Sequence, residues 1–311
     1  MPGTVALTGA TGFIGATLVR QLAAAGWRVR ALVRPASLGR CPAGVEAEWI
    51  AGDLADTDSL HRLTRGVTAV VHCAGAVRGA SRADFDRINV DGTARLVRAA
   101  TATAGPDAPR FLLVSSLAAR VPELSFYAAS KRGGEAQLAA LAGTMDWGIV
   151  RPAAVYGPGD REMLPLFQSM VRGLAPVIGA ATNRVSLVHV EDLAAALLAW
   201  LERGRASAVY EVGDGRPNGY SWREIIAIAE QLRGGRIVRL PLPVPLVRLI
   251  ARLNLTLARL TGRAPMLSPG KVRELTHPDW VADNTSLHTD TGWTARIGLA
   301  EGLRRTLNLA A

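Results

Sequence analysis

A glycine-rich turn lies between a strand pattern and a helix pattern at the start of the chain. The segment TVALTG is a short apolar run typical of a buried strand, and FIGATLVRQLAAAG has the spacing of a helix that ends at Gly26. Such a turn lets backbone approach a pyrophosphate, whose charge then lies at the helix N-terminus. The feature predicts a dinucleotide site. The residues expected to contact the ligand here are Gly9, Thr11, Gly12, Phe13 and Ile14.

Strand patterns and helix patterns alternate over the next 140 or so residues. Further strands are expected at 27–34, 45–54, 67–75, 110–116 and 147–152, and helices at 57–66, 83–105 and 126–143. Such alternation predicts a parallel sheet covered by helices on both faces. The fold class is therefore α/β, a Rossmann-type doubly wound parallel sheet with a smaller C-terminal substrate lobe.

The alternation breaks after Arg151 and Pro152, where the chain becomes richer in Gly and Pro. Order returns with a strand pattern at 184–190, a helix at 191–204 and a short strand at 208–214. We expect residues 1–155 plus 185–213 to form the dinucleotide-binding domain. Residues 156–184 plus 214–311 would then build the substrate lobe.

Composition narrows the classes of protein that this chain can belong to. The formal net charge is +10, but the arginines are scattered and aromatic residues make up only 5%, which disfavours nucleic-acid binding. No basic leader and no apolar run of bilayer length is evident, so we expect a cytoplasmic protein without a transmembrane segment. The two cysteines fit reduced thiols, and no His/Cys spacing suggests a metal site.

The end of the second strand pattern bears on which dinucleotide binds. It reads Val33-Arg34, and the next acidic residue is Glu46. An acidic residue near this point would accept from a ribose 2′-hydroxyl, whereas an arginine suits a 2′-phosphate. We expect NADP, with NAD possible and with Arg34 as the phosphate partner; an ordinary surface charge is the alternative reading of Arg34. Arg30 and Ser37 are candidate helpers.

Other strand ends contribute further candidates for the cofactor site. Asp53 and Leu54 follow the third strand pattern and could border the adenine. The small residues Cys73, Ala74 and Gly75 end the fourth and leave room for the cofactor backbone.

Eight short motifs occur in a characteristic order: TGATGFIG, GDL, HCAG, NVDGT, VSS, YAASK, RPAAVYGPG and LVHVEDLA. In this order and placement the chain resembles the extended short-chain dehydrogenase/reductase family over about its first 215 residues. The C-terminal part matches only loosely. The resemblance implies that Tyr127 and Lys131 are catalytic and also contact the cofactor, together with Pro152 and Val155 of the RPAAVYGPG motif.

The chemistry of Tyr127 and Lys131 is consistent with this assignment. The two residues are four apart in a helix pattern, so both side chains emerge from one face. A phenol has a pKa near 10, and a nearby ammonium together with a positive nicotinamide ring is expected to pull that value toward neutrality. In the family the lysine also donates to the nicotinamide ribose, which a slim ammonium can do better than an arginine.

The family's third catalytic member is a Ser or Thr that ends the fifth strand and orients the substrate oxygen. Ser116 is the preferred candidate, and Ser115 is the fallback. Asn89 could support the site or simply fill a polar gap.

Departures from related enzymes narrow the reaction. Leu117 and Ala118 stand where nucleotide-sugar dehydratases carry an acidic pair, and Ala154 where many epimerases carry Asn. We therefore expect an alcohol/carbonyl oxidoreductase acting by hydride transfer on a hydrophobic or medium-sized small molecule. A nucleotide-sugar epimerase is the alternative enzyme, and a non-catalytic cofactor-binding assembly subunit is the alternative from another class.

An apolar segment follows residue 240, with Arg248, Arg252 and Arg259 along one helical stripe. Four readings are open: lobe core, a subunit interface, a lid over a lipophilic substrate, or a helix that contacts a membrane surface through 244–261. The chain is expected to be a homodimer or a monomer. His189, Trp222 and the stretch from His277 to Trp280 are expected to be packing elements.

Overall fold

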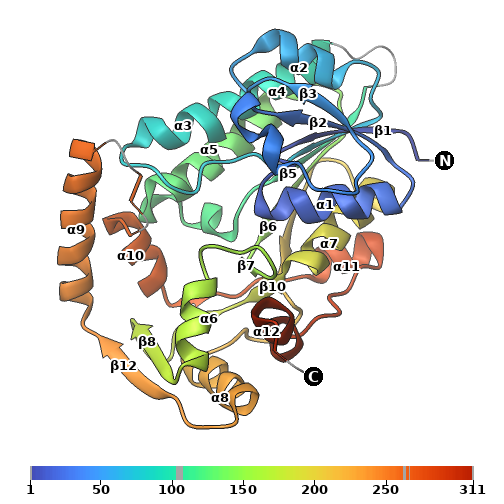
Figure 1. Ribbon diagram of the computed structural model, residues 1–311. Helices are drawn as coiled ribbons and strands as arrows, with labels where there is room; N and C mark the ends of the chain where they lie inside the picture. The colour runs from blue at the N-terminus through green and yellow to red at the C-terminus, as the bar shows by residue number, and fades with distance from the viewer. Residues whose placement is uncertain (1, 103–107, 262–263, 266, 310–311) are drawn as a thin grey trace.

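A parallel sheet forms the centre of the computed structural model, which describes residues 2–102, 108–261, 264–265 and 267–309 (Figure 1). In this part of the chain seven strands pair in the order β11-β6-β5-β4-β1-β2-β3, and every pairing is parallel. This confirms the expected Rossmann-type sheet. The strands are β1 (Thr4–Thr8), β2 (Arg28–Val33), β3 (Glu48–Ala51), β4 (Ala69–His72), β5 (Arg110–Val114), β6 (Trp147–Pro152) and β11 (Ala208–Val212).

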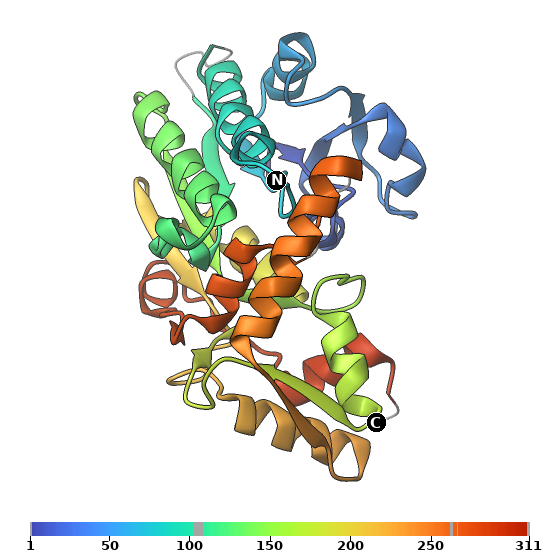
Figure 2. The ribbon, with the colours of Figure 1, turned by 90° about the vertical axis from the view of Figure 1, so that its left-hand side faces the viewer.

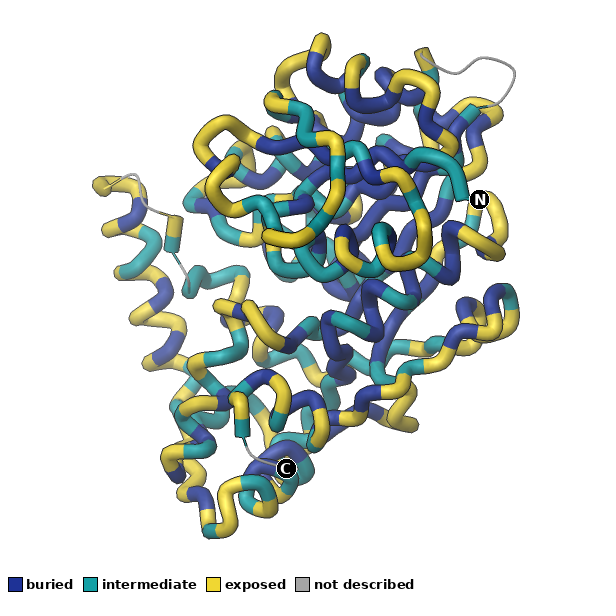
Figure 3. Tube along the Cα trace, turned by 45° about the vertical axis from the view of Figure 1, so that its right-hand side comes forward, coloured by how far each residue is buried: buried dark blue, intermediate teal, exposed yellow. Residues whose placement is uncertain are grey.

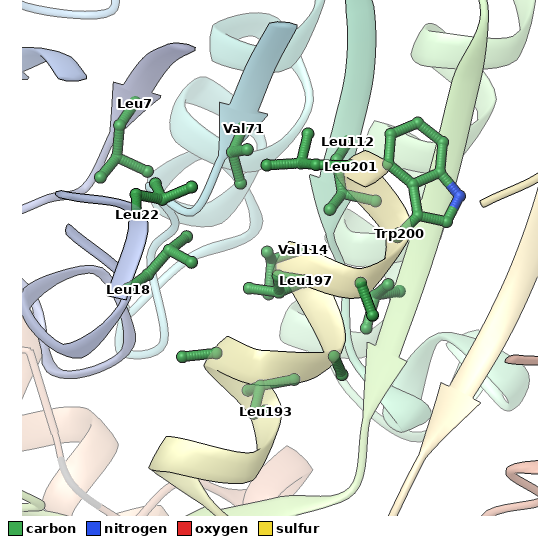
Figure 4. Packing of buried hydrophobic residues seen from close by; sticks show 14 of the residues in the cluster. Leu7, Leu18, Leu22, Val71, Leu112, Val114, Leu193, Leu197, Trp200 and Leu201 are labelled. Atoms are coloured by element: carbon green, nitrogen blue, oxygen red, sulfur yellow. The ribbon is translucent and has the colours of Figure 1, made fainter. Parts of the chain in front are cut away.

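Helices cover both faces of this sheet. One face carries α1 (Phe13–Ala24), α7 (Val190–Arg203) and α11 (Thr285–Thr291), and the other carries α2 (Thr57–Thr64), α4 (Asp91–Ala102) and α5 (Phe126–Leu141) (Figure 1). The central strands β1, β4 and β5 are buried almost throughout because helices pack on both sides of them, whereas β3 at the edge has no buried residue. Figure 4 shows the core under α1 and α7, where leucines of both helices meet the strands. The labelled members are Leu7, Leu18, Leu22, Val71, Leu112, Val114, Leu193, Leu197, Trp200 and Leu201.

Two elements expected to be continuous are divided in the structure. The helix expected at 83–105 is α3 (Arg82–Asn89) followed by α4, with Val90 between them; residues 103–105 lie outside the described residues. The strand expected at 184–190 is β9 (Arg184–Val185) and β10 (Leu187–His189), because the chain changes pairing partner at Ser186. β9 pairs with β13 (Asp279–Trp280), and β10 pairs with β7 (Ala154–Tyr156).

A smaller lobe lies below the carboxyl edge of the large sheet (Figure 1). Its own core gathers around Phe167, Met170 and Ile226, between α6, α8 and α12. The two-stranded pairing of β8 with β12 leads from this core into the long helix α9 and the short helix α10. The elements of this lobe are α6 (Leu164–Val171), β8 (Leu174–Ile178), α8 (Trp222–Arg233), β12 (Val238–Leu242), α9 (Val244–Thr261), α10 (Pro269–Thr276) and α12 (Leu299–Leu307).

The C-terminal segment does not stay within this lobe. Leu287 of α11 and Trp293 pack into the core under α1 and α7, so part of the 214–311 range contributes to the first core. The domain boundaries stay a prediction in other respects. Among the described residues, no helix has the length and hydropathy needed to cross a bilayer.

Candidate active site

The glycine turn after β1 has little room for side chains. Gly9 has a φ of +76°, and a Cβ built there would lie 2.7 Å from the backbone nitrogen of Ala74. A Cβ on Gly15 would overlap the carbonyl oxygen of Gly9. Gly12 is the N-cap of α1 and provides no side-chain cap, and the first turn of the helix contains no acidic residue. The first amide groups of the helix can therefore donate hydrogen bonds to an anion. The turn therefore fits a pyrophosphate cradle; Thr11, Phe13 and Ile14 flank it, partly buried.

The loop after β4 connects this cradle to helix α5. A Cβ on Gly75 would lie 3.4 Å from Nζ of Lys131, so the loop passes directly beside that ammonium. Asn89 holds the loop in place: its amide donates to the carbonyl of Ala76 (3.0 Å) and to Oγ of Ser130 (2.8 Å), and its oxygen accepts from the amide of Ala76. Asn89 is buried, and these contacts give it the supporting position that was one of its two expected roles.

The region after β2 contains an exposed arginine and a short 3-10 helix, η1 (Pro35–Arg40). Arg34 is exposed at the start of η1. The guanidinium of Arg30 donates to Glu48 (2.7 Å) and to the carbonyl of Arg65 (2.7 Å), and its expected role as a phosphate helper stays a prediction. Ser37 is buried and accepts from Arg40, a second arginine near this corner that the sequence reasoning missed.

The remaining cofactor candidates lie at strand ends. Asp53 is partly buried and its carboxylate accepts from the amide of Ala55, and Leu54 is buried next to it. Cys73 and Ala74 back the glycine turn, and burial raises the pKa of the Cys73 thiol to about 12, which keeps it protonated. Two more candidates lie at the end of β6, where the residue is buried, and in β7, where it is partly buried. These are Pro152 and Val155.

Ser116, Tyr127 and Lys131 come together at the carboxyl end of β5. Ser116 precedes the 3-10 helix η2 (Leu117–Arg120), and Ser125 caps the start of α5 by accepting from the amide of Ala128. The side chain of Ser116 lies close enough to the phenol of Tyr127 to lower its pKa. Nζ of Lys131 donates to the carbonyl of Val114 at 2.8 Å. The fallback residue, Ser115, instead donates to Glu135.

The environment of Tyr127 is more apolar than the sequence suggested. Burial raises the pKa of Tyr127 to about 12. Two smaller effects oppose each other: the hydroxyl of Ser116 lowers this pKa, and the negative charge of Glu274 raises it. Phe85 packs edge-on against the ring, with the centroids 6.3 Å apart. The protein alone therefore does not show the expected downward shift, because desolvation dominates. The expectation included the positive charge of a bound nicotinamide, so it stays a prediction for the complex with cofactor.

Lys131 occupies a buried position beside a carboxylate that the sequence reasoning missed. Burial lowers the pKa of Lys131 to about 8, and the negative charge of Glu135 acts in the opposite direction. Glu135 accepts from Arg151 through two nitrogens, at 2.8 and 2.6 Å, and from Ser115 at 2.6 Å. Its position four residues after Lys131, on the same helix face, was the available signal.

A second missed carboxylate comes from the far end of the chain. Glu274 of α10 is buried and accepts from Ser125, the residue that caps the start of α5, and from Lys271 at 3.1 Å. Its negative charge acts on Tyr127. No sequence signal could have found this residue, since 149 positions separate it from Ser125.

This arrangement can exchange a proton with a substrate oxygen beside a dinucleotide cradle. The glycine turn, the Gly75 loop and Ser116 all follow parallel strands, so they share one edge of the sheet. Among the described residues, no cluster of His, Cys, Asp and Glu could hold a metal ion. His189 is fully buried against Tyr156, with ring centroids 5.5 Å apart, as a packing element would be.

Comparisons with known proteins agree with the fold and the cradle. A family model described as "NAD dependent epimerase/dehydratase family" matches residues 5–213. The chain is 40% identical to a ceramide reductase of Caulobacter vibrioides, over 98% of this chain and 94% of that protein. It is 28% identical to a 2-alkyl-3-oxoalkanoate reductase of Stenotrophomonas maltophilia, over 97% of both. The solved structure of MoeE5 in complex with UDP-glucuronic acid and NAD superimposes with a TM-score of 0.73 at 26% identity, over 99% of this chain and 98% of that one. The chain therefore belongs to the NAD-dependent epimerase/dehydratase family, within the extended short-chain dehydrogenases/reductases.

Proposed function

We propose that the protein is an NADP-preferring oxidoreductase that interconverts an alcohol and a carbonyl group on a hydrophobic substrate. The observation that carries this proposal is the position of Tyr127: it lies one helical turn before the buried Lys131, and Ser116 is close enough to its phenol to lower the pKa of Tyr127. All three residues lie at the carboxyl edge of the sheet, where the glycine turn also lies.

The protein's own residues would handle the proton and the oxygen. A bound nicotinamide supplies or accepts the hydride at the substrate carbon. In the reducing direction Tyr127 donates its phenolic proton to the oxygen of the former carbonyl, and Ser116 donates a hydrogen bond to the same oxygen. The ammonium of Lys131 stabilises the phenolate that remains on Tyr127. In the oxidising direction the proton moves the opposite way.

The apolar surroundings of Tyr127 support a hydrophobic substrate. Phe85 packs on its ring, Phe126 is half exposed beside it, and Leu117 and Ala118 are buried where an elimination reaction would need carboxyl groups. The two reductases named above act, by their names, on ceramide and on 2-alkyl-3-oxoalkanoates, molecules that carry alkyl chains. We infer a carbonyl or hydroxyl group on an alkyl chain of a lipid-like molecule.

Replacement of Tyr127 by Phe tests the reaction. Without the phenolic proton we expect turnover to fall by about 100-fold or more, while NADP binding stays within about twofold of the wild type. Turnover is measured as a net change in reduced cofactor with alkyl ketones and alcohols. Isomerisation of a nucleotide sugar with no such change would favour the epimerase, and unchanged physiological function in Tyr127→Phe would favour a non-catalytic subunit.

The preference for NADP rests on the exposed Arg34 and has a separate test. Loss of one charge-assisted contact predicts that Arg34→Ala weakens NADP binding about tenfold or more, with NAD binding changed by less than about twofold. Arg98→Ala, on the exposed side of α4, is the matched control and should leave both affinities unchanged. Tighter binding of NAD than of NADP by the wild type would contradict the preference.

A further inference from the structure

Helix α9 packs against the rest of the protein through only one narrow face. Val247, Ala251 and Ala258 are buried, and Val247 and Ala251 form a small core with Val272 of α10. With about 100° between successive residues, these three buried side chains fall within roughly 40° of one another on the helix. The lobe-core reading of the segment therefore holds for one side of the helix alone (Figure 3).

The opposite face of α9 is apolar and exposed. Six large aliphatic side chains fall within an arc of roughly 100°, pointing away from the buried face. Their exposed fractions run from 42% for Ile250 to 80% for Leu260. We call this surface the outer face of α9, and its members are Leu246, Leu249, Ile250, Leu253, Leu257 and Leu260. Figure 2 looks toward α9, which lies across the near side of the molecule.

Positive charge lies along one border of the outer face. Arg248, Arg252 and Arg259 are exposed and form a stripe between the outer face and the buried face. Arg248 and Arg252 also line a cavity of about 320 Å³ together with Pro269 and Arg273. The sequence contains no Asp or Glu between Glu230 and Glu274 to balance these charges.

We propose that the outer face of α9 docks on a bilayer that contains anionic phospholipid. An amphipathic helix with leucines on one face and arginines at its border lies in the plane of a membrane, with the apolar side chains among the acyl chains. The arginines then meet lipid phosphates, and the cavity they line offers space for a headgroup. A second copy of the chain is a poorer occupant, because its acid-free α9 would bring arginines against arginines.

The docking surface lies close to the candidate active site. Arg273, which lines the cavity, donates to the carbonyl of Leu124 in the 3-10 helix η3 (Pro122–Leu124), three residues before Tyr127. A bilayer in contact with α9 would therefore lie beside the N-terminal end of helix α5. The docking proposal rests on α9 itself and does not depend on the proposed reaction.

Vesicle flotation with outer-face variants tests the apolar part of the proposal. The full chain is mixed with vesicles of phosphatidylcholine alone, or of phosphatidylcholine with phosphatidylglycerol, and we expect it to float only with the second. Leu253→Glu combined with Leu257→Glu should weaken binding about 100-fold, because two apolar side chains that docking would bury among the acyl chains are lost. Val209→Glu, at an exposed site on β11, is the matched control and should bind as the wild type does.

Arginine variants keep the test informative if the glutamate variant misfolds. Arg248→Ala combined with Arg252→Ala should weaken binding to the anionic vesicles about 30-fold. Arg98→Ala combined with Arg203→Ala removes two exposed arginines elsewhere and should have less than about a threefold effect. Binding lost in the first pair and kept in the second would support a site at α9 over attraction by net charge.

Three results would overturn the proposal. They are failure of the wild type to float with anionic vesicles, equal flotation of the folded glutamate and arginine variants, and a wild-type dimer that dissociates in Leu253→Glu/Leu257→Glu without any lipid binding. The last result would assign the outer face to a second copy. Tyr127→Phe should float as the wild type does, so failure of the proposed reaction and failure of docking can be told apart.

Discussion

Replacement of Lys131 by Met should stabilise the free protein at neutral pH while it removes activity. The side chain of Lys131 is buried, and burial lowers its pKa from 10.5 to about 8, so the native fold holds this ammonium at an energetic cost. Methionine fills similar space without charge. The variant is therefore expected to lose the proton-transfer chemistry and to gain stability. Residues that catalysis requires often lower the stability of the fold in this way.

The magnitude and sign of the effect follow from the pKa shift. Because the folded-state pKa of Lys131 lies below the unfolded value, the unfolded chain binds more protons between pH 8 and 10.5, and wild-type stability rises with pH through this range. At pH 7 the ammonium costs the folded state about 3 kcal/mol, and at pH 10 about 1 kcal/mol of that remains. The stability advantage of Lys131→Met over wild type should therefore shrink by about 2 kcal/mol between pH 7 and pH 10.

Urea unfolding of both proteins at the two pH values measures this change. Contributions that do not depend on pH, such as the lost hydrogen bond to the carbonyl of Val114, cancel when the two differences are compared. Lys271→Met, at the chain's other lysine, which is exposed, is the matched control, and its difference from wild type should change by less than about 0.5 kcal/mol. An advantage of Lys131→Met that stays constant or grows as pH rises would refute the reasoning.

Three further predictions concern residues around the site. Glu135→Gln leaves a guanidinium and a buried ammonium without their carboxylate, so urea unfolding should show a loss of about 3 kcal/mol; a loss below about 1 kcal/mol would count against a buried ion pair. Glu274→Gln removes a negative charge that raises the pKa of Tyr127, so the pH profile of kcat/KM should move to lower pH, and a shift to higher pH would contradict the assigned cause. Gly15→Ala places a methyl group against the carbonyl of Gly9, so NADP binding measured by titration should be lost, and retained affinity would show that the turn can relax.

Features encoded by local periodicity were predictable from the sequence. The alternating strand and helix patterns that begin around Gly9 predicted the parallel sheet that the structure shows, because apolar spacing and a tight turn are properties of neighbouring residues. The common face of Tyr127 and Lys131 follows from helix geometry alone. The same logic failed at 184–190, where one apolar run changes partners at Ser186, because pairing depends on segments elsewhere in the chain.

Which serine faces Tyr127 was decided by tertiary packing. Ser115 and Ser116 are chemically alike and adjacent, and in the extended chain that follows β5 their side chains point in different directions, so Ser115 donates to Glu135 and Ser116 lies close enough to Tyr127 to lower its pKa. The pKa of Tyr127 also differed from expectation, since burial depends on how α3 and α5 pack.

The sequence alone therefore determined the pattern of strands and helices, the glycine cradle and the pairing of a phenol with an amine, because each depends on residues within a few positions of one another. Only the tertiary structure decided that Glu274 reaches the start of α5 and that the leucines of α9 stay exposed. The first outcome depends on two segments 149 residues apart and the second on which segments pack against α9, and burial and electrostatic coupling of this kind leave no periodic trace in the chain.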